Sequence, residues 1–423
     1  MMVQKSDFPV IEGMRCLWSM LNFSRICSIL AGFALLILPT PSMKARVLIL
    51  PSILWLVSCL PGTAPVANSP ALHPTGFNTQ APPNASPTAP HLVTTGEPMP
   101  TPSTGWFELV GHSPLLERGM NAGLAVHGSY AYVGSRTDGR HANAGVLVVD
   151  ISNLANPQVI YQIGSPEEAL VGQTSRELRV WPEQELLLVM NVDCGAVLHD
   201  CGQPVTSPNL NIYDISGANA ALPKLILTFP LGRTPHEMFL WDDPQVDGRA
   251  LLYLSTFGAA IDKLFILDIS QARNGVISEV GAWSPPFGSS HSGLHSLSLS
   301  VDGRRGYLAH DEDGFMILDT SQYADALPNP QASLMTPPEN WAKSPVGAHS
   351  AVKLFGKPYA LITEEVYGLC PWGWTYLIDI TDESRPFFVS EYKLFPYNTI
   401  EHCAGTTYEQ NRYTSFSSHN PTL

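Results

Sequence analysis

Four histidines recur at one position of a repeated local pattern, each directly before a polar residue. They are His236, His295, His349 and His419, followed by Glu237, Ser296, Ser350 and Asn420. Imidazole is the commonest side-chain ligand for zinc, copper, iron and nickel in proteins. If the fold brings these side chains together, they form a candidate site for a transition metal, copper or zinc.

Three glutamates are expected near these histidines: Glu237, Glu364 and Glu365. A carboxylate that accepts a hydrogen bond from the second ring nitrogen orients a metal-bound imidazole. A second interpretation stays open, because a repeat copies structural residues as faithfully as functional ones. In that case each histidine only hydrogen-bonds to the neighbouring repeat, and Arg176, which takes the same position in an earlier repeat, belongs to the same packing pattern.

A sequence repeat predicts the strands that position these residues. Five short apolar runs each end in aspartate, an apolar residue or threonine, and a hydroxyl residue: 146–152, 210–216, 264–270, 315–321 and 375–381. A four-stranded unit that returns every fifty to sixty residues is typical of a propeller blade. We therefore predict an all-β chain, a β-propeller of four-stranded blades, with five complete blades and a partial sixth that looks truncated.

Each run is expected to be the third strand of its blade, and the first strand to line a central channel. The aspartates Asp150, Asp214, Asp268, Asp319 and Asp379 should accept backbone N–H groups two residues on. The histidines then lie on first strands and should converge at one mouth of the channel. Asp311 and Asp313, at the end of a second strand, are expected to be solvated.

The two ends of the repeat region predict the partial blade. Trp106–Gly111 resembles an outermost strand without a blade, and 418–423 resembles the start of a sixth first strand. The two middle strands have no counterpart in the sequence. We therefore expect either that several tens of residues are missing or that the ring stays open.

The repeat resembles the LVIVD-repeat family of bacterial secreted and surface β-propellers. The resemblance covers roughly Trp106 to the end, and the last copy, followed by Glu383-Ser384-Arg385-Pro386, has the family's ending. It implies the fold and names no reaction. The histidine pattern is also similar to that of selenium-binding protein and methanethiol oxidase propellers, which implies a copper site in the channel.

Composition and motifs exclude several functions. The net charge is −14 and no Lys/Arg cluster stands in the repeat region, which argues against nucleic acid as a partner. Only 14% of residues are charged, while glycine and proline number 33 and 37, as suits short strands joined by turns. P-loop, Rossmann, nucleophile-elbow and HExxH patterns are absent from the sequence.

The first part of the chain is interpreted as a targeting region. Met43-Lys44-Ala45-Arg46 is basic, 47–57 is apolar, and 56–59 matches a lipobox ending at Cys59, the predicted lipidation site. An uncleaved membrane anchor is the alternative. We predict a signal region over 1–59 that starts at Met43, a disordered Pro/Thr/Ser-rich stalk over 60–104, and the propeller over 105–423.

Four cysteines remain in the exported part, an even number that suits an oxidising compartment. We predict disulfides between Cys194 and Cys201 and between Cys370 and Cys403. In the alternative, Cys194, His199 and Cys201 bind a metal.

The sequence favours a lipid-anchored propeller of the bacterial cell envelope that binds or scaffolds an unknown protein or small-molecule ligand. The alternative is a metal-dependent, copper-type oxidoreductase with a histidine-lined channel. These two classes differ in one property that can be measured, the metal content.

Overall fold

The computed structural model describes residues 108–118, 120–164, 172–193, 208–256, 263–286, 293–344, 347–365 and 373–392. All described residues belong to one compact unit. Among them no helix is long and apolar enough to cross a membrane. The predicted signal region, stalk, lipidation site Cys59 and all four paired cysteines lie outside the described residues.

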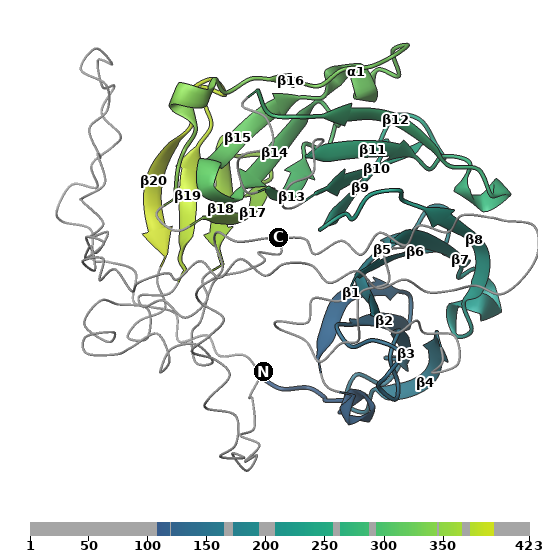
Figure 1. The fold of residues 1–423 in the computed structure, drawn as a ribbon. Helices are drawn as coiled ribbons and strands as arrows, with labels where there is room; N and C mark the ends of the chain where they lie inside the picture. Colours follow the sequence, from purple (N-terminus) through teal and green to yellow (C-terminus); the bar gives the residue numbers. More distant parts are fainter. Residues whose placement is uncertain are drawn as a thin grey trace, which may run out of the picture. The chain divides into compact units, whose positions relative to one another are not determined.

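Five four-stranded antiparallel sheets, the blades, follow one another along the chain (Figure 1). Blade 1 contains β1 (Asn121–His127), β2 (Tyr130–Ser135), β3 (Val146–Asp150) and β4 (Gln158–Ile163). Blade 2 contains β5 (Gln173–Trp181), β6 (Leu186–Asp193), β7 (Asn209–Asp214) and β8 (Lys224–Pro230). Blade 3 contains β9 (Met238–Asp242), β10 (Ala250–Ser255), β11 (Leu264–Asp268) and β12 (Ser278–Trp283).

Blade 4 contains β13 (Leu294–Leu299), β14 (Arg305–His310), β15 (Gly314–Asp319) and β16 (Ser333–Leu334). Blade 5 contains β17 (Ala348–Lys353), β18 (Tyr359–Glu364), β19 (Thr375–Asp379) and β20 (Phe387–Tyr392). The described helices are single turns: η3 (Leu115–Glu117), η4 (Gly217–Ala220), η5 (Ala272–Asn274), η7 (Asp311–Asp313), α1 (Ser321–Ala324) and η8 (Pro338–Asn340). The predicted β-propeller with five complete blades is confirmed.

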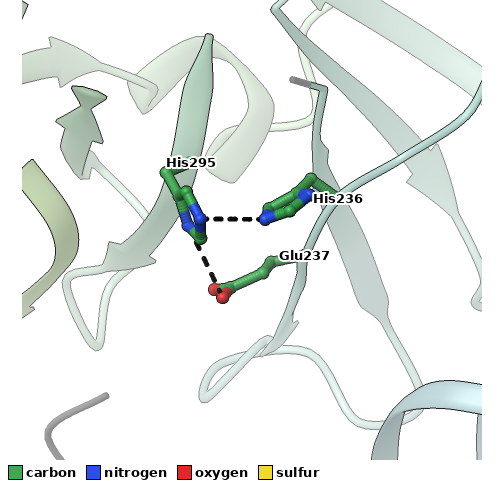
Figure 2. Close-up of side chains that lie close together, drawn as sticks. All are labelled: His236, Glu237 and His295. Carbon is green, nitrogen blue, oxygen red and sulfur yellow. Dashed lines mark hydrogen bonds and ion pairs between the residues drawn. The ribbon is translucent and has the colours of Figure 1, made fainter. Parts of the chain in front are cut away.

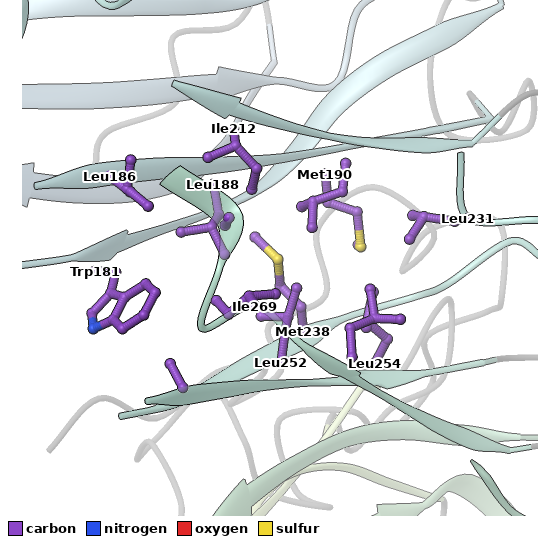
Figure 3. Close-up of a cluster of buried hydrophobic side chains, with 14 of the residues drawn as sticks. Trp181, Leu186, Leu188, Met190, Ile212, Leu231, Met238, Leu252, Leu254 and Ile269 are labelled. Atoms are coloured by element: carbon purple, nitrogen blue, oxygen red, sulfur yellow. The ribbon is translucent and has the colours of Figure 1, made fainter. Parts of the chain in front are cut away.

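The apolar cores lie between consecutive blades, and β6 shows why its sequence is continuously apolar. Leu186, Leu188 and Met190 pack on blade 3, beside Trp181 and Leu252 (Figure 3). The residues between them, Leu187 and Val189, pack on blade 1. Because successive side chains of a strand point to opposite faces, a sheet buried on both faces needs apolar residues at every position.

The repeated aspartates have the predicted role. Each ends the third strand of its blade, and its Oδ1 accepts a hydrogen bond from the N–H two residues on, at 2.8–3.1 Å. The donors are Ser152, Ser216, Ser270, Ser321 and Thr381. The turn into the outermost strand is therefore built by the same contact in all five blades.

The predicted sixth blade falls almost entirely outside the described residues. Of the predicted strand Trp106–Gly111, residues 108–111 are described and do not form a strand. Gly111 lies against the turn after β3, where a Cβ would stand 1.9 Å from the carbonyl oxygen of Leu154. His419 and the rest of 418–423 lie outside the described residues.

Candidate metal centre

β-Bulges in the first strands of the blades set the directions of the candidate side chains. The ladder between β5 and β6 skips Arg176, that between β13 and β14 skips His295, and that between β17 and β18 skips His349. Such β-bulges bend the strand and redirect the side chain of the extra residue. In blade 3, His236 and Glu237 both hydrogen-bond through the backbone to Ser255, which is the same two-to-one arrangement.

Contacts between blades hold these bulges side by side. The hydroxyl of Ser255 in blade 3 donates to the carbonyl of His295 in blade 4, at 2.8 Å. The hydroxyl of Ser296 in blade 4 donates in the same way to the carbonyl of His349 in blade 5, at 2.9 Å. Strand β5 also lies against β9, β9 against β13, and β13 against β17. The first strands of four blades therefore meet where the histidines stand.

The side chains converge on His295. Its Nε2 lies 2.9 Å from Nε2 of His236 (Figure 2) and 3.5 Å from Oε2 of Glu365. The same carboxylate oxygen lies 3.4 Å from Nε2 of His349. Two ligand atoms bound to one ion at about 2.0–2.1 Å and tetrahedral angles are about 3.3 Å apart. The measured separations fall around this value.

The opposite nitrogens of two histidines have polar partners. Oε1 of Glu237 lies 3.8 Å from Nδ1 of His295 (Figure 2), and Oγ of Ser350 lies 2.8 Å from Nδ1 of His349. In His349, a proton on Nδ1 that is donated to Ser350 leaves the Nε2 lone pair directed at Glu365. Oxygen atoms commonly fix the tautomer of metal-binding histidines in this way.

Two overlapping three-residue groups result. One consists of His236, Glu237 and His295, and the other of His295, His349 and Glu365. In each group the ligand atoms lie within 4.8 Å of one another. Since His295 belongs to both, it is the centre of the site, and His295 and His349 are only 6% and 2% exposed.

Burial controls the protonation of the cluster. Desolvation lowers the pKa of His236 well below its usual value, and the charge of Arg176 lowers it further, so this imidazole is neutral and able to bind a metal. Desolvation also raises the pKa of Glu237, to about 8, with the charge of Glu177 adding to the effect. A metal ion that binds beside Glu237 therefore competes with a proton.

The structure places most of the predicted site residues in the cluster but not Glu364. It brings His236, Glu237, His295, His349 and Glu365 together. Glu364 instead points into blade 5, where its carboxylate accepts hydrogen bonds from the N–H of Trp374 at 3.0 Å and the hydroxyl of Tyr376 at 3.5 Å. Its described contacts are those of a core residue, and the adjacent Glu365 supplies the carboxylate of the cluster.

The contact between His310 and Asp313 was not predicted from the sequence. Asp313 was expected to be solvated, yet it is buried, and its Oδ2 lies 3.1 Å from Nδ1 of the fully buried His310. The single-turn helix η7 explains this difference, because it turns the chain back after β14 and carries Asp313 under the strand end. The spacing of His310 and Asp313, three residues apart, was the available signal.

The comparisons with known proteins concern the fold. Sqt1 from Chaetomium thermophilum is similar over 66% of this chain and 62% of its own, with 11% identity and a TM-score of 0.42. The periplasmic gluconolactonase PpgL of Pseudomonas aeruginosa is similar over 66% and 69%, with 16% identity and a TM-score of 0.44. A nidogen/laminin complex gives 64% and 79%, 8% identity and a TM-score of 0.37.

The search of curated proteins finds no match to this sequence. Residues 118–163 match the sequence model of the LVIVD repeat family. This stretch begins at Arg118 and ends with β4, so it coincides with blade 1. The chain is thus a β-propeller whose first blade matches the LVIVD repeat model.

Proposed function

We propose that this propeller binds one transition-metal ion through His295, His349 and Glu365, with His236 beside them and Glu237 orienting His295. The observation that carries the proposal is the convergence of buried imidazole and carboxylate ligand atoms, from three separate blades, at separations suited to one ion. A purely structural role for the histidines does not require them to share carboxylates in pairs, as His236 and His295 share Glu237 and His295 and His349 share Glu365.

The ligand types favour zinc or copper. Imidazole suits both metals, and a carboxylate completes a three-ligand set. A site with three protein ligands keeps a position for a further ligand, which is the property of catalytic rather than structural zinc sites. A copper ion held there would supply redox chemistry. The protein's own contribution is to fix the imidazole tautomer of His349 through Ser350, to hold Glu237 beside His295 and to exclude water by burial.

Metal analysis of the purified protein tests the proposal. We expect about one zinc or copper ion per chain, and a loss of nearly all of it in His295→Ala, which removes a ligand from both groups. His349→Ala should have the same effect, whereas His236→Ala should retain most of the metal. His127→Ala, a histidine of β1 paired with Glu185, is the matched control. Substoichiometric metal in the unsubstituted protein contradicts the proposal.

From the sequence we further propose that the propeller is displayed at the bacterial cell envelope by lipid on Cys59 and by the stalk over 60–104. In this position the metal domain acts as a binding module for a protein or small molecule outside the cytoplasmic membrane. Metabolic labelling with palmitate should mark the protein but not Cys59→Ser. Equal labelling of the two contradicts the lipid anchor and leaves the metal site untouched.

A further inference from the structure

Arg176 occupies in blade 2 the bulge position that His295 and His349 occupy in blades 4 and 5. One of its terminal nitrogens lies 3.0 Å from Nε2 of His236, and the other 3.4 Å from Nδ1 of the same ring. A guanidinium remains protonated in proteins. A fixed positive charge therefore stands within hydrogen-bond distance of a residue beside the proposed metal ion.

A second guanidinium adds to this charge. Arg136 follows β2, and its backbone N–H is bound to the carbonyl of Met120 in the neighbouring segment. Burial lowers the pKa of Arg176, and the positive charge of Arg136 lowers it further. Glu177, the nearest carboxylate in sequence, is paired with Arg179 at 3.2 Å.

The charges around the site do not balance once a metal ion is bound. Glu237 and Glu365 are the remaining carboxylates that act on Arg176. Among the described residues, a divalent ion and the Arg176 guanidinium together outweigh these two glutamates. Uncompensated charge is costly in a buried site, because the surroundings cannot solvate it as water does. An anion that binds between the metal and Arg176 would offset this excess.

The free edge of Arg176 indicates the kind of anion. Its Nε is buried and has no hydrogen-bond partner in the part of the chain that the structure describes. The Nε–H and a terminal N–H of arginine form a planar pair of donors that matches the two oxygens of a carboxylate. We propose that Arg176 binds the carboxylate of a small organic acid that coordinates the metal ion. This inference rests on the proposed metal site.

Acetate is the probe, added to the 423-residue protein loaded with cobalt(II), whose visible absorption reports on its ligands. We expect a saturable change in that absorption, measured against chloride at equal ionic strength. Arg176→Gln should weaken acetate binding at least tenfold while it raises cobalt affinity, because a cation beside the metal is removed. Arg176→Lys keeps the charge but lacks the planar pair of donors. Its acetate affinity should therefore lie between those of the unsubstituted protein and Arg176→Gln. Arg304→Gln, at an exposed ion pair with Asp325, is the control.

The outcomes separate the two proposals. If cobalt binds but acetate leaves the absorption unchanged, or binds Arg176→Gln as tightly as the unsubstituted protein, the anion site is wrong and the metal site stands. If Arg176→Gln loses both metal and acetate while Arg176→Lys behaves as the unsubstituted protein, the arginine only maintains the structure and the anion site is again wrong. If no cobalt binds to the unsubstituted protein, both proposals fail.

Discussion

Replacing the repeated aspartates one at a time should destabilise the propeller in proportion to the contacts each one makes. Asp379 accepts a single hydrogen bond, from the N–H of Thr381 at 2.8 Å. Asp214 accepts bonds from the N–H and hydroxyl of Ser216, at 3.1 and 2.7 Å, and from Nδ2 of Asn219 at 2.8 Å. It also lies 3.3 Å from a guanidinium nitrogen of Arg273.

A net hydrogen bond contributes about 1 kcal/mol, and less where water replaces the lost partner. Asp379→Ala should therefore cost about 1 kcal/mol and Asp214→Ala about 2 kcal/mol. Urea unfolding followed by tryptophan fluorescence measures both free energies on the same transition. Asp379→Asn keeps the acceptor oxygen and serves as the control, with an expected loss below that of the alanine variant. Equal losses for Asp214→Ala and Asp379→Ala, or an Asn variant as unstable as Ala, would refute the assignment.

Three further predictions concern the site, the turns and the core. Because burial raises the pKa of Glu237 to about 8, metal binding at pH 7 should release a proton that Glu237→Gln does not release, as titration calorimetry in two buffers would reveal. Hydrogen bonds from Ser152 lower the pKa of Asp150. These hydrogen bonds therefore stabilise the folded protein above the ordinary aspartate pKa, and this stabilisation is lost as the pH falls through the lower pKa of the folded state. Asp150→Asn should therefore make the free energy of unfolding less sensitive to acid. An unchanged acid transition contradicts this. Leu252→Ala, in the core between blades 2 and 3, should cost about 2–5 kcal/mol in urea unfolding, and a loss under 1 kcal/mol would contradict its packing.

Much of the fold could be predicted because every blade contains a sheet that is buried on both faces. The third strands expected within 146–152 and 264–270 are β3 and β11, since an apolar run between two turns has few other solutions in a sheet buried on both faces. The outermost strands are harder to predict from the sequence. In blade 4 this strand is reduced to Ser333–Leu334, and the proline-rich sequence around it supplies few of the N–H donors that a longer ladder needs.

The site could be predicted only in part, because alignment of the repeats finds equivalent positions but not side-chain directions. It placed His236, His295, His349 and His419 in one group, and the structure brings the first three together, while His419 lies outside the described residues. It could not choose between Glu364 and Glu365. Adjacent residues at a strand end point to opposite sides, so one had to enter blade 5 and the other the cluster. Nothing in the sequence states which one does so.

The bulges explain why one repeated position can serve both packing and binding. A regular first strand would keep each side chain in the alternation of its own sheet, facing one neighbouring blade or the other. The extra residue departs from that alternation, so its side chain can point along the inner end of the blades, where it meets its counterparts. The backbone of the bulge is bound by the preceding blade through Ser255 and Ser296 whatever the side chain is. Because the side chain at this position is not required for packing the sheet, the chain can hold arginine at one bulge and histidine at the others, and so build a site whose two sides differ in charge.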